Sequence, residues 1–153
     1  MKPKAIFFDM SDTLYQNADL KNAIFRKPIM QLSKVRNISY GEAKELFDKT
    51  KEELKPTMSY VPKAVVMVKL GVSRLDMQEA LTEIDVKKFL QPDKELDIIL
   101  ERLHGQFEVG IITNILRKFL YNILDALEID KTYFRYVVSV DNTSNSKPHE
   151  EPF

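Results

Sequence analysis

The stretch that decides the fold is Phe7-Phe8-Asp9-Met10-Ser11-Asp12-Thr13-Leu14, in which an apolar run ends at a carboxylate. Residues 4–8 are too few and too apolar for a surface helix, and they suit a strand buried on both faces. A strand that ends at Asp9 presents this carboxylate at the carboxyl edge of a sheet, where ligands bind in open α/β sheets. The alternative is an ordinary strand-to-helix turn that uses Asp and Ser for their turn chemistry. This segment alone does not separate the two.

Length and composition narrow the class of protein. The chain has 153 residues, which suits one domain or one domain with a modest insertion. Charges interrupt every long apolar run, so we expect no membrane span. Lys and Arg number 23, as do Asp and Glu, so the charge does not suggest a nucleic-acid or anionic-membrane partner. With no cysteine and a first strand close to the N-terminus, we expect a cytoplasmic protein.

Residues 16–91 carry only helical signals. The first apolar periodicity contains Pro28, which should kink or split its helix. Capping boxes at 39–42 and 73–76 begin two further helices. Residues 62–71 begin with proline and end with glycine, as helices do. We therefore expect a helical insertion after the first strand.

Strand and helix patterns alternate in the rest of the chain. Two short runs rich in β-branched residues, 109–112 and 136–140, alternate with amphipathic helical patterns. Such alternation implies right-handed crossovers and a parallel sheet. We expect an α/β fold, with a Rossmann-like three-layer parallel sheet core formed by 1–15 and 92–153. The remaining residues, 16–91, would form an inserted helical cap.

The loop after the first strand resembles a family signature. In the haloacid dehalogenase (HAD) superfamily, most of whose members are phosphohydrolases, an apolar strand is followed by Asp-x-Asp-Gly-Thr-Leu. Asp9, Thr13 and Leu14 match this signature. Ser11 stands in place of the second Asp, and Asp12 in place of Gly.

Two later segments extend the resemblance. Residues 110–114 look like the second signature, a strand that ends in Thr113 and Asn114. Residues 146–153 are similar to the family's Lys-Pro segment and contain Lys147. The order and the spacing also match, including a helical cap between the first strand and the rest. The resemblance therefore covers the whole chain.

The resemblance implies a role for each matched residue. Asp9 would attack phosphorus and form an aspartyl-phosphate, with Mg²⁺ held by its carboxylate and by the backbone carbonyl of Ser11. Thr113 would donate a hydrogen bond to a phosphoryl oxygen, and Lys147 would act as a point charge on both anions. The plain alternatives are a strand-ending β-branched residue for Thr113 and a solvated loop cation for Lys147. Two further residues would contact the substrate: Thr13 and Asn114.

Ser11 separates the candidate functions. In the family, the second Asp is also the general acid/base, and the loss of such a group typically costs about 10²–10⁴-fold in rate. The first expectation is a HAD-like phosphohydrolase that acts on a small phosphorylated metabolite. The alternative is a truncated or catalytically impaired relative that binds phosphate-like ligands or a partner without efficient turnover. Dehalogenase or phosphonatase chemistry is third, because its leaving groups have different proton needs.

The fourth family signature, an acidic cluster after a fourth strand, is not found in the sequence. We therefore expect a truncated chain whose core is incomplete at its C-terminal end and whose Mg²⁺ is held weakly. By family topology the fourth strand pairs with the first. Residues 4–8 would then be an apolar edge, and we expect self-association through that edge.

Overall fold

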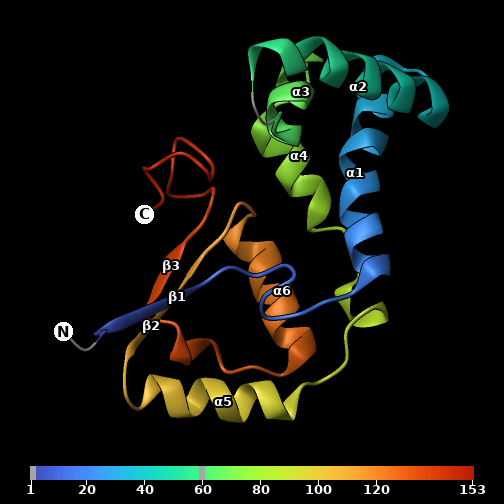
Figure 1. The fold of residues 1–153 in the computed structure, drawn as a ribbon. Helices are drawn as coiled ribbons and strands as arrows, with labels where there is room; N and C mark the ends of the chain where they lie inside the picture. Colours follow the sequence, from blue (N-terminus) through green and yellow to red (C-terminus); the bar gives the residue numbers. More distant parts are fainter. Residues whose placement is uncertain (1–2, 59–60) are drawn as a thin grey trace. The chain divides into compact units, whose positions relative to one another are not determined.

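The computed structural model describes residues 3–58 and 61–153, and its contacts divide the chain into two compact units. The core unit comprises Met1–Ala18 and Asp85–Phe153, and the helical unit comprises Asp19–Ile84 (Figure 1). Contacts thus assign the linking residues 16–18 and 85–91 to the core unit, where the side chain of Asn17 donates to the carbonyl of Phe89 over 2.7 Å. No helix in the described ranges is long and apolar enough to cross a membrane.

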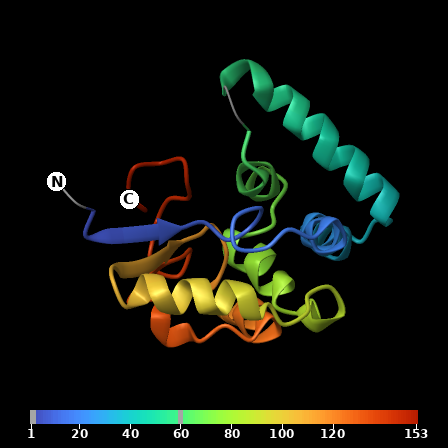
Figure 2. The same ribbon diagram turned by 60° about the horizontal axis from the view of Figure 1, so that its bottom comes forward.

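The core unit contains a parallel sheet with the strand order β1-β2-β3. Its strands are β1 (Ala5–Phe8), β2 (Glu108–Ile112) and β3 (Tyr136–Val138). The connecting helices α5 (Lys94–His104) and α6 (Arg117–Leu127) lie beside the sheet (Figures 1 and 2), and two short 3₁₀ turns, η2 (Val86–Lys88) and η3 (Lys131–Tyr133), complete the unit. The prediction of a Rossmann-like α/β fold is confirmed.

One face of the sheet is half open. Phe7, Gly110 and Tyr136 lie in one register row across the strands. The rings of Phe7 and Tyr136 meet over the glycine with centroids 6.0 Å apart, and they are 47% and 43% exposed. On the opposite face, Ile111 is fully buried. The prediction that β1 is buried on both faces is therefore wrong, because β1 is an edge strand whose alternate side chains lie on the open face.

The helical unit follows the capping signals of its sequence. It contains α1 (Ala18–Arg36, which begins in the core unit), α2 (Tyr40–Leu54), the 3₁₀ turn η1 (Lys55–Thr57), α3 (Lys63–Lys69) and α4 (Arg74–Leu81). Ser39 and Glu42 form the predicted capping box of α2. Pro28 does not split α1. The proline is buried together with Ile29 and Leu32, so packing offsets the hydrogen bond that it removes.

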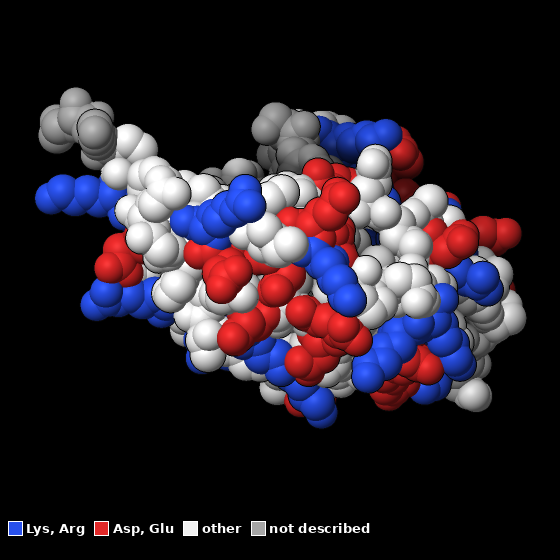
Figure 3. All heavy atoms as spheres, turned by 90° about the horizontal axis from the view of Figure 1, so that it is seen from below, with Lys and Arg blue, Asp and Glu red and all other residues white. Residues whose placement is uncertain are grey.

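The surface of the core unit mixes both signs of charge. On the side that carries α5, acidic side chains gather over the helix with lysines and arginines among them (Figure 3). Within α5, Glu95 and Asp97 lie in the first turn and His104 in the last, which suits the helix dipole. Nδ1 of His104 also lies 3.1 Å from the carbonyl oxygen of Tyr133, so the ring joins the end of α5 to η3.

Candidate active site

A tight turn after β1 presents Asp9 at the carboxyl edge of the sheet. The amide of Leu14 donates to the carbonyl of Met10 over 2.9 Å, and the amide of Asp12 donates to the carbonyl of Tyr15 over 2.9 Å. Asp12 has a φ of 61°, a left-handed conformation that Asp tolerates better than most residues. Met10 is buried and anchors the turn. The backbone of this loop is therefore well bonded, while the Asp9 side chain remains half exposed at 50%.

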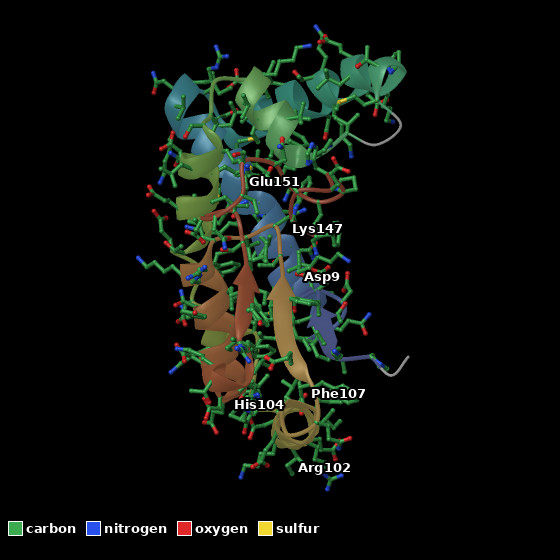
Figure 4. All side chains as sticks on the ribbon, turned by 90° about the vertical axis from the view of Figure 1, so that its left-hand side faces the viewer. Asp9, Arg102, His104, Phe107, Lys147 and Glu151 are labelled. Carbon is green, nitrogen blue, oxygen red and sulfur yellow. The ribbon has the colours of Figure 1, made fainter. Side chains whose placement is uncertain are left out.

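Lys147 joins the ends of β1 and β2. Its Nζ donates to Oδ1 of Asp9 over 2.7 Å and to the carbonyl of Ile112 over 2.7 Å. The lysine side chain is only 18% exposed. Figure 4 shows Asp9 and Lys147 together at one end of the sheet, with His104 at the other end. A cation is thus held against a carboxylate that water and small solutes can reach.

The segment that carries Lys147 is held from two sides. The amide side chain of Asn114 accepts from the Lys147 amide over 2.8 Å and donates to the Lys147 carbonyl over 3.1 Å. The carboxylate of Glu151 accepts from the backbone amides of Ser144 and Asn145 over 2.7 and 2.8 Å. The bond from the Ser144 backbone, followed by that from the Asn145 side chain, lowers the pKa of Glu151. The loop is therefore closed around Lys147.

Two other predicted site residues, Thr113 and Thr13, follow the ends of β2 and β1. Thr113 is buried directly after Ile112, and its amide donates to the carbonyl of Val138 over 2.9 Å, which places it between the ends of β2 and β3. Thr13 is exposed in the turn after β1, where its amide donates to the Met10 carbonyl over 3.3 Å. The structure thus brings three of the predicted residues together: the side chain of Lys147 is bonded to Asp9, and its backbone is bonded to Asn114. Thr113 adjoins them at the strand end.

Ser11 is bonded to an aromatic residue of its own loop. Its Oγ lies 2.9 Å from Oη of Tyr15, and the two residues also form an isolated parallel bridge. Burial raises the pKa of the Tyr15 phenol, the hydrogen bond between Tyr15 and Ser11 lowers it, and the charges of Asp12 and Asp9 raise it further. The result is a pair of neutral hydroxyl groups in the turn that follows Asp9.

The start of α6 is capped by a residue of the loop after β3. Asp141 accepts from the amide of Arg117 over 2.6 Å and from the hydroxyl of Ser139 over 2.8 Å. It thereby caps α6 in place of Leu116, which makes no side-chain cap. The interaction joins residues 24 positions apart, so no local capping pattern announces it.

The oxygen donors of the loop suit a magnesium ion. In residues 3–58 and 61–153, no group of three or more His, Cys, Asp or Glu residues gathers as a metal site. Mg²⁺ commonly takes one or two carboxylates and completes its octahedron with water and substrate phosphate. The half-exposed Asp9 carboxylate and the backbone carbonyl of Ser11 are hard oxygen donors of this kind. They would supply the smaller part of such a shell.

Comparison with known proteins agrees with this geometry. Residues 6–153 match the haloacid dehalogenase-like hydrolase family. The chain belongs to this family. The predicted family is therefore confirmed. A search among curated proteins finds no significant match.

Solved structures of HAD proteins have a similar fold. The HAD hydrolase YfnB of Bacillus subtilis, solved bound to magnesium, has a TM-score of 0.50 and 16% identity, over 100% of this chain and 72% of that chain. The L-2-haloacid dehalogenase of Xanthobacter autotrophicus, solved with chloropropionic acid covalently bound, has a TM-score of 0.49 and 18% identity, over 99% of this chain and 62% of that chain. The present chain thus spans less than two thirds of the dehalogenase. At 16% identity, the likeness to YfnB shows the fold alone.

Proposed function

We propose that this HAD-family chain is a phosphohydrolase that moves a phosphoryl group from a small phosphorylated metabolite to Asp9 and then to water. The observation that carries the proposal is the 2.7 Å contact between Asp9 Oδ1 and Lys147 Nζ at the carboxyl edge of the sheet. A half-exposed carboxylate paired with an ammonium group is a nucleophile with its own counter-charge.

Each residue has a defined task in this proposal. A carboxylate oxygen of Asp9 attacks phosphorus, and the bond from phosphorus to the leaving oxygen breaks. Lys147 offsets the negative charge of the carboxylate and of the phosphoryl group. The Thr113 hydroxyl donates to a phosphoryl oxygen. Water then attacks the aspartyl-phosphate, which releases inorganic phosphate and returns the Asp9 carboxylate. Thr13 and Asn114 adjoin the bound phosphate, and Asn114 also fixes the backbone of Lys147.

Magnesium fits this proposal as a cofactor. The Asp9 carboxylate and the Ser11 carbonyl would hold the ion, and when bound it supplies positive charge that offsets the repulsion between the carboxylate and the phosphate. We also infer that the helical unit is the cap that the family resemblance implies. A cap favours small substrates, because a covered site excludes bulky molecules.

The proposal is tested with a panel of phosphate compounds in the presence of Mg²⁺. The chain should release inorganic phosphate from at least one of them, and Asp9→Asn should release none, because an amide is not a nucleophile toward phosphorus. Release that survives in Asp9→Asn would reject Asp9 as the nucleophile.

Ser11 favours a second candidate, a protein that binds phosphate-like ligands or a partner without efficient turnover. The Ser11 hydroxyl, bonded to Tyr15, is not a titratable acid or base. Beryllofluoride, which mimics a phosphoryl group on a carboxylate, distinguishes the candidates. Binding of beryllofluoride that depends on Asp9, with no turnover on the panel, would support the second candidate. Including 2-chloropropionate and a phosphonate in the panel tests the third chemistry, cleavage of carbon–halogen or carbon–phosphorus bonds.

A further inference from the structure

We propose that the side-chain amine of Lys63 is a binding site for carbon dioxide, which it takes up covalently as a carbamate. Lys63 is the first residue of α3, and its side chain is half-buried. It belongs to the helical unit, whereas Asp9 belongs to the core unit, so this site does not depend on the function proposed above. The groups around its ammonium nitrogen point to this chemistry.

The ammonium group of Lys63 has weak partners. Its Nζ lies 4.8 Å from the centroid of the Phe25 ring and 3.4 Å from the carbonyl oxygen of Ile24. A hydrogen bond from nitrogen to oxygen is normally shorter, at about 2.7–3.2 Å. Among the residues that the structure describes, no carboxylate forms an ion pair with Lys63 or with Lys51. A lysine withdrawn from water is usually paired, so the protonated form of Lys63 is poorly stabilised here.

Other lysines bring positive charge to the same place. The charge of Lys51, on α2, acts on Lys63. Lys44, also on α2, has its Nζ 5.9 Å from the centroid of the Phe25 ring that Lys63 contacts. The carboxylates of α2 that form ion pairs are taken by other lysines: Asp48 by Lys44, Glu52 by Lys55 and Glu53 by Lys69. This lysine cluster (Lys44, Lys51 and Lys63) therefore disfavours a further cation and favours an anion.

The same surroundings make Lys63 a nucleophile near neutral pH. Burial, and then the charge of Lys51, lowers the pKa of Lys63 from 10.5 to about 8. At a pH of about 7.5, about a quarter of the chains then carry the neutral amine at this position, against about one in a thousand for an ordinary lysine. The neutral amine has a free electron pair, and an ammonium group has none. A desolvated lysine beside a second cation is a general way to activate this side chain.

The reaction with carbon dioxide balances without a further reactant. The electron pair of Nζ attacks the carbon, a nitrogen–carbon bond forms, and the electron pair of one carbon–oxygen π bond moves to oxygen. The nitrogen loses one proton to solvent, and the product is a carbamate with one negative charge. The repulsion between Lys63 and Lys51 thereby becomes an attraction. Carbon dioxide is small and uncharged, which suits a half-buried amine.

The test uses ¹³C NMR of the full chain equilibrated with ¹³C-labelled bicarbonate and carbon dioxide at a pH of about 7.5. Two carbamate signals are expected, one from Lys63 and one from the α-amino group of the chain, whose ordinary pKa is also close to 8. The Lys63 signal should be at least as large as the α-amino signal, because the lysine cluster supplies counter-charge. Triethyloxonium, which ethylates carbamates, followed by digestion and mass spectrometry, should locate one adduct on Lys63 without the need for a variant.

Three variants assign the Lys63 signal and its cause. Lys63→Arg keeps a positive charge but is no nucleophile at this pH, so the Lys63 signal should disappear while the α-amino signal remains. Lys51→Met should lower the Lys63 signal relative to the α-amino signal, because the amine becomes more basic and the carbamate loses its counter-charge. Lys27→Arg is the matched control. Lys27 lies in the same unit and pairs with Glu83, and this variant should leave both signals unchanged.

The possible outcomes are distinct. A full chain with no carbamate on Lys63, by NMR and by ethylation, would overturn the proposal, as would a second signal that persists in Lys63→Arg. Labelled bicarbonate that binds equally to the full chain and to Lys63→Arg, with no adduct on Lys63, would show a noncovalent anion site instead. An unchanged ratio of signals in Lys51→Met would reject the lysine cluster as the cause. Phosphate release is tested separately by Asp9→Asn, so none of these results decides the proposed function.

Discussion

Replacing Lys147 with Met should lower activity strongly while changing stability little. The ion pair with Asp9 is partly exposed, at 18% and 50%, and such pairs contribute about 0.2–1 kcal/mol. The hydrogen bond to the Ile112 carbonyl adds about 0.5–1.5 kcal/mol. We therefore expect the free energy of unfolding to fall by about 0.7–2.5 kcal/mol. The rate should fall further, by about 10²–10³-fold, because a positioned charge acts on the transition state.

Two assays on the same samples measure these effects: urea unfolding followed by circular dichroism, and phosphate release from acetyl phosphate. Lys27→Met in the helical unit is a matched control, because Lys27 pairs with Glu83 at 2.9 Å and the two side chains are 25% and 59% exposed. The control should lose no more stability than Lys147→Met, and it should keep its activity. If Lys147→Met unfolds readily but retains turnover, the ion pair between Asp9 and Lys147 has a structural role only, and its proposed role in turnover is wrong.

Three further predictions concern stability and association. Burial, and to a lesser extent Lys51, lowers the pKa of Lys63 from 10.5 to about 8. The unfolded chain therefore binds more protons than the folded chain between these two values, and stability should rise with pH through that window. Lys63→Met should remove the rise and stabilise the protein at pH 7 by about 3 kcal/mol at most, and an unchanged pH dependence of urea unfolding would contradict this. Gly110→Ala places a Cβ 2.5 Å from the Phe7 ring and 3.0 Å from the Tyr136 carbonyl oxygen, so it should destabilise the protein by about 1–3 kcal/mol. The cost should be smaller when Phe7 is already alanine, and equal costs in both backgrounds would exclude the ring contact as the cause. The edge strand β1 should also cause concentration-dependent self-association in sedimentation velocity, which Phe7→Lys should reduce; a monomer at high concentration would count against this.

The parts of the fold that depend on local chemistry were predictable from the sequence. The capping box of Ser39 and Glu42 works within four consecutive residues, so its pattern and its structure coincide. The pairing of Asp9 with Lys147 joins residues 138 positions apart. This pairing could still be predicted from the sequence, because parallel strands bring their carboxyl ends to one edge of the sheet.

Other features depend on contacts that no short pattern encodes. The expected strand 136–140 ends early at Val138, because the side chain of Asn142 takes the amide of Ser139 over 2.8 Å. The exposure of Phe7 depends on what lies beside β1 and over its face. The bond between Ser11 and Tyr15 depends on the side-chain conformations of a tight turn. The sequence therefore predicted which residues lie together at the sheet edge better than it predicted their hydrogen-bond partners.

The most direct measurement of the central claim is the location of the phosphoryl group during turnover. The full chain is mixed with acetyl phosphate and Mg²⁺, quenched in acid, digested and mapped by mass spectrometry. We expect one phosphoryl group on Asp9, less of it in Lys147→Met and none in Asp9→Asn. Phosphate release without a modified Asp9, or a phosphoryl group on a different residue, would contradict the account.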